Sequence, residues 1–270
     1  MCGIWYLTSK RELPFDDVLK SAKKIEHRGE DGYGSLVDYI DFQRFEKKSR
    51  ERLVLPSHKE IRTWIVNYLY TTVGDAVVKY KNIPPAVWFN KKNVVKINVL
   101  GNNPLFTFLN GEFKVDEQRK QLQDLGFIIR STNDTAVVGG YVQKYLLDGC
   151  DLMESVINTL TRISGAYAII FYRDGESIIA QDVFGTRPLC LYISDNGDTI
   201  MATSESQAIQ PIDPFYIEKL MTDHPYSAGY RNFIPGEVIR IKNHEIIEAY
   251  HMKKEGLLWR NSDLTQNVII

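Results

Sequence analysis

Short runs of β-branched and aromatic residues recur along the chain, and most of them end at clusters of Gly, Asn, Asp or Pro. Runs of this kind, bounded by turn residues, are typical of β-strands. They predict strands over residues 2–7, 61–73, 94–100, 105–109, 166–172, 177–182, 189–193, 199–204, 237–242 and 245–250. Turn signals at 173–175 and 195–198 are short enough to join consecutive strands as hairpins, so we expect antiparallel pairing.

Other segments carry apolar residues three or four positions apart, which is the period of an amphipathic helix. Helices are predicted over residues 15–26, 116–125, 135–147 and 151–163, with short ones near 205–209 and 214–221. Asn133 and Asp134 are both candidates for the N-cap of the helix that follows them. Residues 42–60 are rich in Lys, Arg and Glu, and we expect them to form a solvated loop or an exposed helix.

Sets of hairpin strands with helices between them favour one fold class. We predict an α+β fold of antiparallel sheets covered by helices, rather than a doubly wound parallel sheet. The composition of the 270-residue chain, 44% hydrophobic and 25% charged, excludes disordered, collagen-like and coiled-coil chains. A net charge of −1 gives no reason to expect nucleic acid or an anionic membrane as a partner.

Several sequence features bear on location and cofactors. No apolar run reaches the roughly 18–20 residues that cross a bilayer, and the N-terminus lacks the features of a secretory signal. The three sparse cysteines argue against a disulfide framework and fit a reducing compartment. The five histidines show no ligand spacing. We therefore expect a cytoplasmic protein with no metal and no cofactor.

Cys2 is the strongest candidate nucleophile. Cysteine is small enough to permit removal of the initiator methionine, which would leave Cys2 as the first residue. Such a residue carries a thiol and an α-amine on one carbon. The thiolate is the nucleophile, and an α-amine, with an ordinary pKa of about 7.7–8.0, is suited to act as its base. The alternative is a small buried side chain at the start of a strand.

Short motifs in a fixed order support the first interpretation. They are 27–31 (HRGED), 110–112 (NGE), 131–135 (STNDT), 165–168 (GAYA), 182–189 (DVFGTRPL), 204–209 (SESQAI) and 235–237 (PGE). Each is weak alone, but together with the opening MCGIW they resemble the class II glutamine amidotransferase domain, an N-terminal-nucleophile hydrolase. The opening and the NGE motif are most like asparagine synthetase, whereas SES and PGE are closer to amidophosphoribosyltransferase.

The resemblance implies a four-layer αββα sandwich of two antiparallel sheets that hydrolyses glutamine. It implies that Cys2 forms a γ-glutamyl thioester, and that the Asn110 side chain and the Gly111 backbone N–H donate to the oxyanion. It assigns the substrate α-ammonium to Asp134. The other pocket residues that it implies are Glu112, Thr71, Thr72, Val73, Arg28 and Gly29.

One feature of the family is missing. The family holds the substrate α-carboxylate with an arginine, and the matching position here is Leu69, which cannot form a bidentate pair with a carboxylate. Three explanations are open: Arg62 serves instead, another basic residue reaches in, or the site binds free glutamine poorly. Asp182 and Arg187, in contrast, are predicted to form a buried structural pair.

The resemblance covers residues 1–250 and leaves 251–270 as a C-terminal tail, with no recognisable synthetase or transferase domain. The leading hypothesis is a glutaminase that produces glutamate and ammonia, and that either feeds the ammonia to a separate synthase chain or acts as a plain glutaminase. A second hypothesis is a non-catalytic binding or regulatory subunit with the same fold. A third is an amidase that acts on another γ-glutamyl amide.

Overall fold

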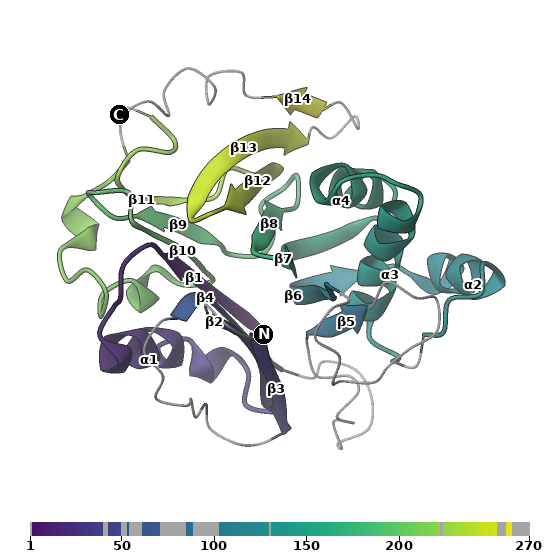
Figure 1. The fold of residues 1–270 in the computed structure, drawn as a ribbon, viewed down its shortest axis with the longest axis horizontal. Coiled ribbons are helices and arrows are strands. Elements are labelled where there is room, and N and C mark those ends of the chain that lie inside the picture. Colours follow the sequence, from purple (N-terminus) through teal and green to yellow (C-terminus); the bar gives the residue numbers. More distant parts are fainter. Residues whose placement is uncertain are drawn as a thin grey trace.

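The computed structural model describes residues 2–39, 43–49, 53, 61–70, 85–88, 103–129, 131–221, 224–252 and 258–260. In this part of the chain two β-sheets lie face to face, and helices cover the outer face of each (Figure 1). The layers therefore run helix, sheet, sheet, helix. This arrangement confirms the predicted α+β fold and the four-layer sandwich.

The first sheet has seven strands in the order β11-β9-β10-β1-β4-β2-β3, and its neighbouring strands are antiparallel. Their bounds are β1 (Gly3–Ser9), β2 (Gly32–Tyr39), β3 (Gln43–Ser49), β4 (Ile61–Leu69), β9 (Cys190–Ile193), β10 (Thr199–Thr203) and β11 (Gly229–Asn232). Strand β1 is central, with β10 on one side and β4 on the other. The segment that follows Cys2 is therefore held from both sides.

The second sheet also has seven antiparallel strands, in the order β14-β13-β12-β8-β7-β6-β5. Their bounds are β5 (Ala86–Trp88), β6 (Leu105–Phe113), β7 (Gly165–Arg173), β8 (Glu176–Gln181), β12 (Glu237–Lys242), β13 (Glu245–Met252) and β14 (Leu258–Arg260). Strand β14 comes from the segment expected as a C-terminal tail and pairs with the end of β13.

Four α-helices and several 3₁₀ turns complete the described part. Their bounds are α1 (Phe15–Lys23), η1 (Glu26–Arg28), α2 (Asp116–Asp124), α3 (Asp134–Leu147), α4 (Leu152–Leu160), η3 (Ser206–Ala208) and η4 (Tyr216–Glu218). The Asn133 side chain accepts a hydrogen bond from the Thr135 N–H at 2.9 Å, so Asn133 is the N-cap of α3. Asp151 and Glu154 form a capping box at the start of α4.

Alternation along β1 divides its side chains between two hydrophobic cores. Ile4 and Tyr6 point between the sheets, where they share a buried cluster with Phe108 of β6. Trp5 points to the opposite face, in the cluster that α1 covers, and its indole N–H donates to Ser21 of α1 at 2.9 Å. This period of two explains why a continuous apolar run forms the central strand of a covered sheet.

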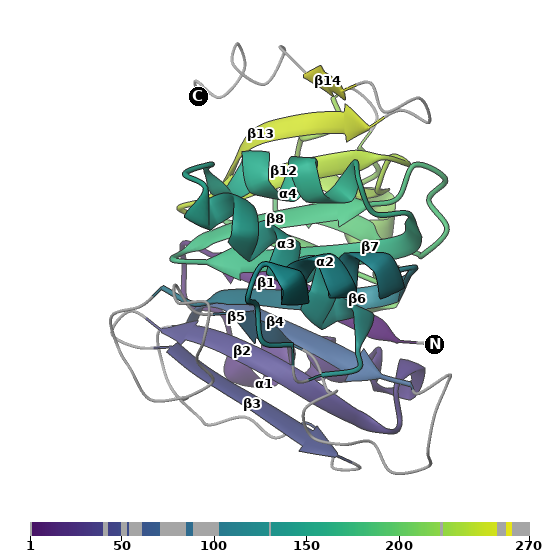
Figure 2. The same ribbon diagram turned by 90° about the vertical axis from the view of Figure 1, so that its right-hand side faces the viewer.

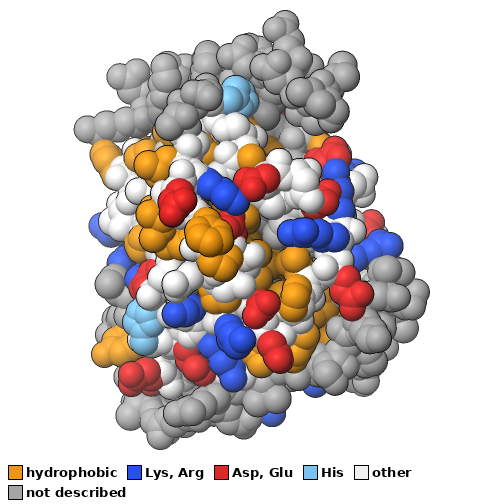
Figure 3. All heavy atoms as spheres, turned by 90° about the vertical axis from the view of Figure 1, so that its left-hand side faces the viewer, with side chains coloured by type: hydrophobic (Ala, Val, Ile, Leu, Met, Phe, Trp, Pro, Cys, Tyr) orange, Lys and Arg blue, Asp and Glu red, His pale blue; other side chains and the backbone are white. Residues whose placement is uncertain are grey.

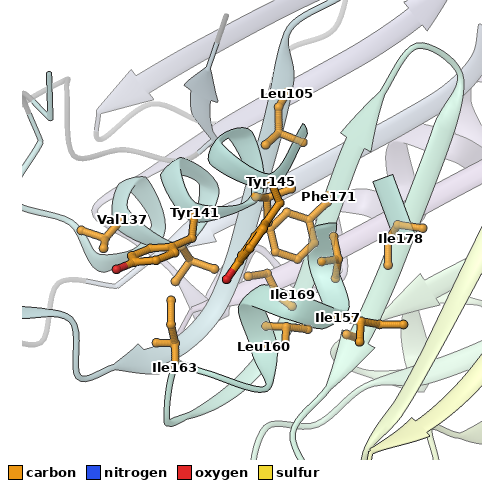
Figure 4. Packing of buried hydrophobic residues seen from close by; sticks show 14 of the residues in the cluster. Leu105, Val137, Tyr141, Tyr145, Ile157, Leu160, Ile163, Ile169, Phe171 and Ile178 are labelled. Atoms are coloured by element: carbon orange, nitrogen blue, oxygen red, sulfur yellow. The ribbon is translucent and has the colours of Figure 1, made fainter. Parts of the chain in front are cut away.

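Helices α3 and α4 cover the outer face of the second sheet, and α2 lies beside them (Figure 2). Tyr141 and Tyr145 of α3 and Leu160 of α4 pack in one cluster with Ile169 and Phe171 of β7 (Figure 4). The second sheet is thus buried on both faces, which holds its strand β6 in place. On the face at the left of Figure 1, hydrophobic and charged side chains are interspersed (Figure 3).

Some predicted elements were wrong or incomplete. Residues 43–49 form the edge strand β3, so the prediction of a solvated loop or exposed helix over 42–60 is wrong there. Charged residues are common on edge strands, where they hinder pairing with the strands of other chains. Strands β2, β5 and β11 were not predicted, because glycines open β2 and the other two are short. The strand predicted over 94–100 lies outside the described residues.

A buried ion pair shapes the connection between β11 and β12. Glu237 is fully buried, and Arg231 forms a forked pair with it, at 2.6 Å from Nη2 to Oε1 and 2.9 Å from Nη1 to Oε2. The Tyr226 hydroxyl and the Ile234 N–H also donate to this carboxylate, at 2.6 and 3.0 Å. These bonds fix the turn at Pro235, which follows directly.

Replacing Arg231 with methionine is expected to lower the free energy of unfolding by about 3–5 kcal/mol, because it leaves a buried carboxylate without its cation. The control is Arg11→Met, at an exposed arginine, which is expected to change stability by no more than about 0.5 kcal/mol. Urea unfolding followed by circular dichroism measures both. Equal stabilities of the two variants would contradict this role of the pair.

Candidate active site

Cys2 lies just before β1, and its Sγ atom contacts the backbone of Tyr70 after β4. Sγ is 3.5 Å from the Tyr70 nitrogen and 3.6 Å from the Tyr70 carbonyl oxygen. Burial raises the pKa of the Cys2 thiol, although the contact with Tyr70 and the positive charge of Arg187 oppose this change. The thiol form therefore predominates at neutral pH, and a base must remove its proton before the sulfur attacks.

Asn67 joins the two sheets next to Cys2. Its side chain is fully buried, donates from Nδ2 to the carbonyl oxygen of Gly3 at 3.1 Å, and accepts at Oδ1 from the Leu109 N–H at 2.9 Å. Gly3 follows Cys2, and Leu109 precedes Asn110. One amide therefore sets the separation between the candidate nucleophile on one sheet and the candidate oxyanion donor on the other.

Ser204 forms a second bridge between the same strands. Its hydroxyl oxygen accepts from the Ile4 N–H at 3.0 Å and from the Asn110 side-chain amide at 3.4 Å. Asn110 is itself buried. The next residue, Gly111, packs so closely on β7 that a Cβ atom would lie 2.3 Å from the carbonyl oxygen of Ala166. Only glycine fits there, so the backbone at Gly111 is fixed by its neighbour strand.

Asp134 reaches the same end of the molecule from the start of α3. Its Oδ2 atom accepts from the Phe113 N–H and its Oδ1 atom from the Thr135 N–H, both at 2.8 Å. Burial raises the pKa of the Asp134 carboxyl, and the charge of Glu112 acts in the same direction. The charge of Asp134 in turn acts to raise the pKa of the Cys2 thiol.

Arg28 and Gly29 lie against the other side of Cys2. The Arg28 Nε atom donates to the Cys2 carbonyl oxygen at 3.1 Å, and its Nη1 atom pairs with Glu205 at 2.8 Å. At Gly29 a Cβ atom would lie 2.5 Å from the backbone nitrogen of Leu69. In this position Arg28 orients the backbone of the candidate nucleophile.

Leu69 occupies the position that the resemblance assigns to the carboxylate-binding arginine. It is two residues beyond Asn67 on β4, so its side chain points to the same, inner face of the sheet. Arg62 is seven residues before Leu69 on the same strand, which at about 3.3 Å per residue puts it roughly 23 Å away. Arg62 is therefore excluded as the substitute. Thr71, Thr72 and Val73 lie outside the described residues.

The predicted structural pair between Asp182 and Arg187 does not form. The Asp182 carboxylate accepts from the N–H groups of Tyr167, Phe184 and Thr186 and from the Thr186 hydroxyl, at 2.9–3.1 Å for the shortest contact of each. The turn that follows Asp182 supplies all of these donors except the Tyr167 N–H, which comes from β7, so the carboxylate needs no cation. The prediction of an Asp–Arg pair was wrong for this reason.

Three residues that organise the site were given no role from the sequence: Asn67, Ser204 and Glu205. The signal for Asn67 is a single amide in the middle of an otherwise apolar strand, since a buried polar side chain requires partners. Ser204 and Glu205 belong to the SESQAI motif, but their partners lie far away in the sequence. Nothing local indicates them.

The described ranges also bear on metal and membrane binding. Within them, no group of three or more His, Cys, Asp and Glu side chains is arranged to hold a metal ion. No helix there is long and apolar enough to cross a membrane. All three cysteines of the chain are free thiols.

Comparison with known proteins gives consistent matches. Residues 98–211 match the glutamine amidotransferase domain family. The amidophosphoribosyltransferase of Methanocaldococcus jannaschii is 27% identical over 255 residues, which cover 92% of this chain and 48% of that protein. The glutamine–fructose-6-phosphate aminotransferase (isomerizing) of Sulfolobus acidocaldarius is 25% identical over 187 residues, 66% of this chain and 29% of that protein. The chain thus spans about half the length of these relatives or less.

Solved structures agree on the fold. The glutamine phosphoribosylpyrophosphate amidotransferase of B. subtilis has a TM-score of 0.71 at 21% identity, over 93% of this chain and 49% of that one. A glutamine aminotransferase class-II domain protein from Silicibacter pomeroyi has a TM-score of 0.50 at 11% identity, over 90% of this chain and 96% of that one.

These relatives support the amidophosphoribosyltransferase side of the resemblance, and the likeness to asparagine synthetase stays a prediction. The sequence matches and the four-layer fold both agree with the motifs that follow Cys2. Residues 98–211 accordingly carry a glutamine amidotransferase domain, and the chain is similar in sequence to enzymes of the class II glutamine amidotransferases, which are N-terminal-nucleophile hydrolases.

Proposed function

We propose that this domain hydrolyses glutamine to glutamate and ammonia through a γ-glutamyl thioester on Cys2. The observation that carries the proposal is the pair of polar bridges, Asn67 and Ser204, that join the start of β1 to Asn110 on the other sheet. They bring together a nucleophile and an amide donor from different sheets. Acyl transfer needs both at one carbonyl group.

The reaction begins once removal of Met1 has freed the α-amine of Cys2. This amine accepts the thiol proton, and Sγ bonds to the side-chain carbonyl carbon of glutamine. The Asn110 side chain and the Gly111 N–H donate to the oxyanion. The C–N bond then breaks and the proton held by the amine leaves with ammonia. Water next adds to the thioester carbon, one of its protons passes to sulfur, and glutamate departs.

Asp134 has the capacity to bind the substrate α-ammonium. A carboxylate offers about four acceptor positions, and two of those on Asp134 are taken by backbone N–H groups. Burial raises the pKa of this carboxyl, so its charge is poorly compensated without substrate. A bound ammonium group supplies the missing positive charge and favours the ionised form.

The ammonia acceptor is part of the same proposal. The two relatives are named as an amidophosphoribosyltransferase and an aminotransferase, names that imply transfer to an acceptor, which supports passage of the ammonia to an acceptor rather than its release. We assign the acceptor step to a separate synthase chain. We also place the reaction in the cytoplasm, because three free thiols suit a reducing compartment.

Leu69 favours a second candidate. With leucine at the carboxylate position, an amidase for a γ-glutamyl amide that lacks a free α-carboxylate fits the pocket as well as a glutaminase does. A non-catalytic binding subunit is the remaining alternative, and it differs from both enzymes because ligand binding would not depend on the Cys2 thiol.

Cys2→Ala is expected to reduce glutamate release from glutamine by at least about 10³-fold, because no other group can form the thioester. The matched control is Cys150→Ala, which removes a free thiol after α3 and is expected to keep activity within about twofold. A coupled glutamate assay measures both variants. Turnover that survives Cys2→Ala would exclude the thioester mechanism.

A cleavable extension before Cys2 is expected to abolish glutamate release, because the α-amine is then a peptide nitrogen and cannot accept the thiol proton. Proteolytic removal of the extension should restore release, and intact mass shows when Cys2 becomes the first residue. Full activity with the extension in place would remove the α-amine from the mechanism.

Asn110→Ala is expected to lower kcat by roughly 10²–10³-fold, because one oxyanion donor is lost. Its control is Asn158→Ala, at an exposed position of α4. Steady-state kinetics with glutamine compares the two, and thermal unfolding verifies that both are folded. If Asn110→Ala changes KM alone, the side chain binds substrate without stabilising the oxyanion.

A further inference from the structure

Arg187 is a cation near the site to which no described residue offers an ion pair or a hydrogen bond at Nε. Its Nε atom is buried and has no hydrogen-bond partner, and its guanidinium forms no ion pair with any described residue. Arginine stays charged at physiological pH, and a buried donor without a partner costs about 1–3 kcal/mol. The side chain as a whole is only partly buried, so part of it is open to a ligand.

The loop that carries Arg187, residues 182–189, connects the second sheet to the first. It starts near Asn110 on β6. Gln181 at the end of β8 pairs with Ala168 of β7, and Ala168 pairs with Asn110 of β6. These three residues therefore lie side by side across the second sheet. The Gln181 side chain donates to the Arg187 carbonyl oxygen at 2.6 Å, which ties the backbone of Arg187 to this row.

The same loop ends near β1, the strand that follows Cys2. Cys190, the first residue of β9, pairs with Thr203 of β10, and Thr203 pairs with Trp5 of β1. Residues 182–189 thus close the end of the sandwich at which Cys2 precedes β1. The charge of Arg187 acts on the Cys2 thiol, in agreement with this position.

The loop holds its shape without help from the guanidinium. Asp182 binds the N–H groups of the turn after it, and the Gly236 N–H donates to the Asp182 carbonyl oxygen at 2.9 Å. Gly185 has a φ of +62°, and a Cβ atom there would lie 3.0 Å from Pro235. Because these contacts fix the loop, the guanidinium of Arg187 is not needed to fold it.

We propose that Arg187 binds the α-carboxylate of the substrate and replaces the arginine that is absent at Leu69. A free α-amino acid carries one positive and one negative group on the same carbon. Asp134 offers the negative partner from the start of α3, and Arg187 offers the positive partner from the 182–189 loop; both charges act on the Cys2 thiol. A guanidinium is the side chain best suited to bind a carboxylate through two parallel hydrogen bonds.

This inference rests on the proposed hydrolysis of a γ-glutamyl amide and narrows its substrate. With Arg187 as the carboxylate partner, the substrate must have both a free α-ammonium and a free α-carboxylate. Glutamine meets this requirement, and its α-carboxamide, which is neutral at that position, does not. The amidase alternative raised by Leu69 is thereby disfavoured.

The kinetic test compares glutamine with glutamine α-carboxamide. Arg187→Met is expected to lower kcat/KM for glutamine roughly 10–100-fold more than kcat/KM for the α-carboxamide, mostly through KM. Arg187→Lys keeps the charge but loses the fork, and it should fall between Arg187→Met and the native protein. Equal losses for both substrates, or an unchanged KM for glutamine, would overturn the assignment.

A binding test separates this proposal from the hydrolytic one. Calorimetry with glutamine uses Cys2→Ala protein, in which no turnover occurs, alone and combined with Arg187→Met or with Arg11→Met as the control. Affinity should fall roughly 10–100-fold with the first combination and stay within about twofold with the second. Suppose that glutamine binding to Cys2→Ala protein depends on Arg187, while protein with an intact Cys2 releases no glutamate. The proposed function then fails and the inference about Arg187 stands. Glutamine binding that ignores Arg187 would refute the inference alone.

Discussion

The geometry of the site depends on one buried amide. Asn67 spans the space between the sheets, bonding to the Gly3 carbonyl oxygen on one side and the Leu109 N–H on the other. A buried polar group without a partner is costly, so these bonds are favoured over any arrangement that breaks them. This requirement locks the relative positions of β1 and β6. The candidate nucleophile Cys2 and the candidate oxyanion donor Asn110 are each next to a residue whose backbone Asn67 binds, so a one-residue slip in either strand would separate them.

Burial acts in the same direction on two ionisable groups of the site, Cys2 and Asp134. It raises the pKa of the Cys2 thiol and of the Asp134 carboxyl, so both groups are held away from their ionised forms. A ligand with a positive charge favours the ionised form of Asp134, and a base with a suitable pKa can remove the proton of the Cys2 thiol. In the proposed mechanism the substrate supplies the first and the freed N-terminus supplies the second. Reactivity is therefore withheld until the chain is processed and substrate is bound.

The sequence allowed the fold class and most strands to be predicted, because covered sheets read as apolar runs and the motifs after Cys2 are ordered as in the family. It did not reveal β3, since a charged edge strand has the composition of a solvated loop. Contacts between distant segments were also hidden. The lone amide of Asn67 in an apolar run indicates that it needs partners but not which ones, and the bridge formed by Ser204 has no local signature. Asp182 was paired with the wrong partner because a carboxylate near an arginine in sequence suggests an ion pair, whereas backbone N–H groups of β7 and of the turn after Asp182 bind it instead.

The parts of this site differ in how far they can vary. The sulfur and the oxyanion donors must meet one carbon atom within bonding and hydrogen-bonding distance, so their backbone positions are fixed by the sheets. A carboxylate partner has a weaker constraint. The arginine side chain is long, and its charge and forked donors can approach the same anion from different backbone positions. Leucine at position 69 removes the cation from β4 without disturbing the strand, since Leu69 still pairs with Gly32. An arginine on the crossing loop 182–189, which is fixed by its own hydrogen bonds, can then take over the carboxylate, and the catalytic backbone need not move.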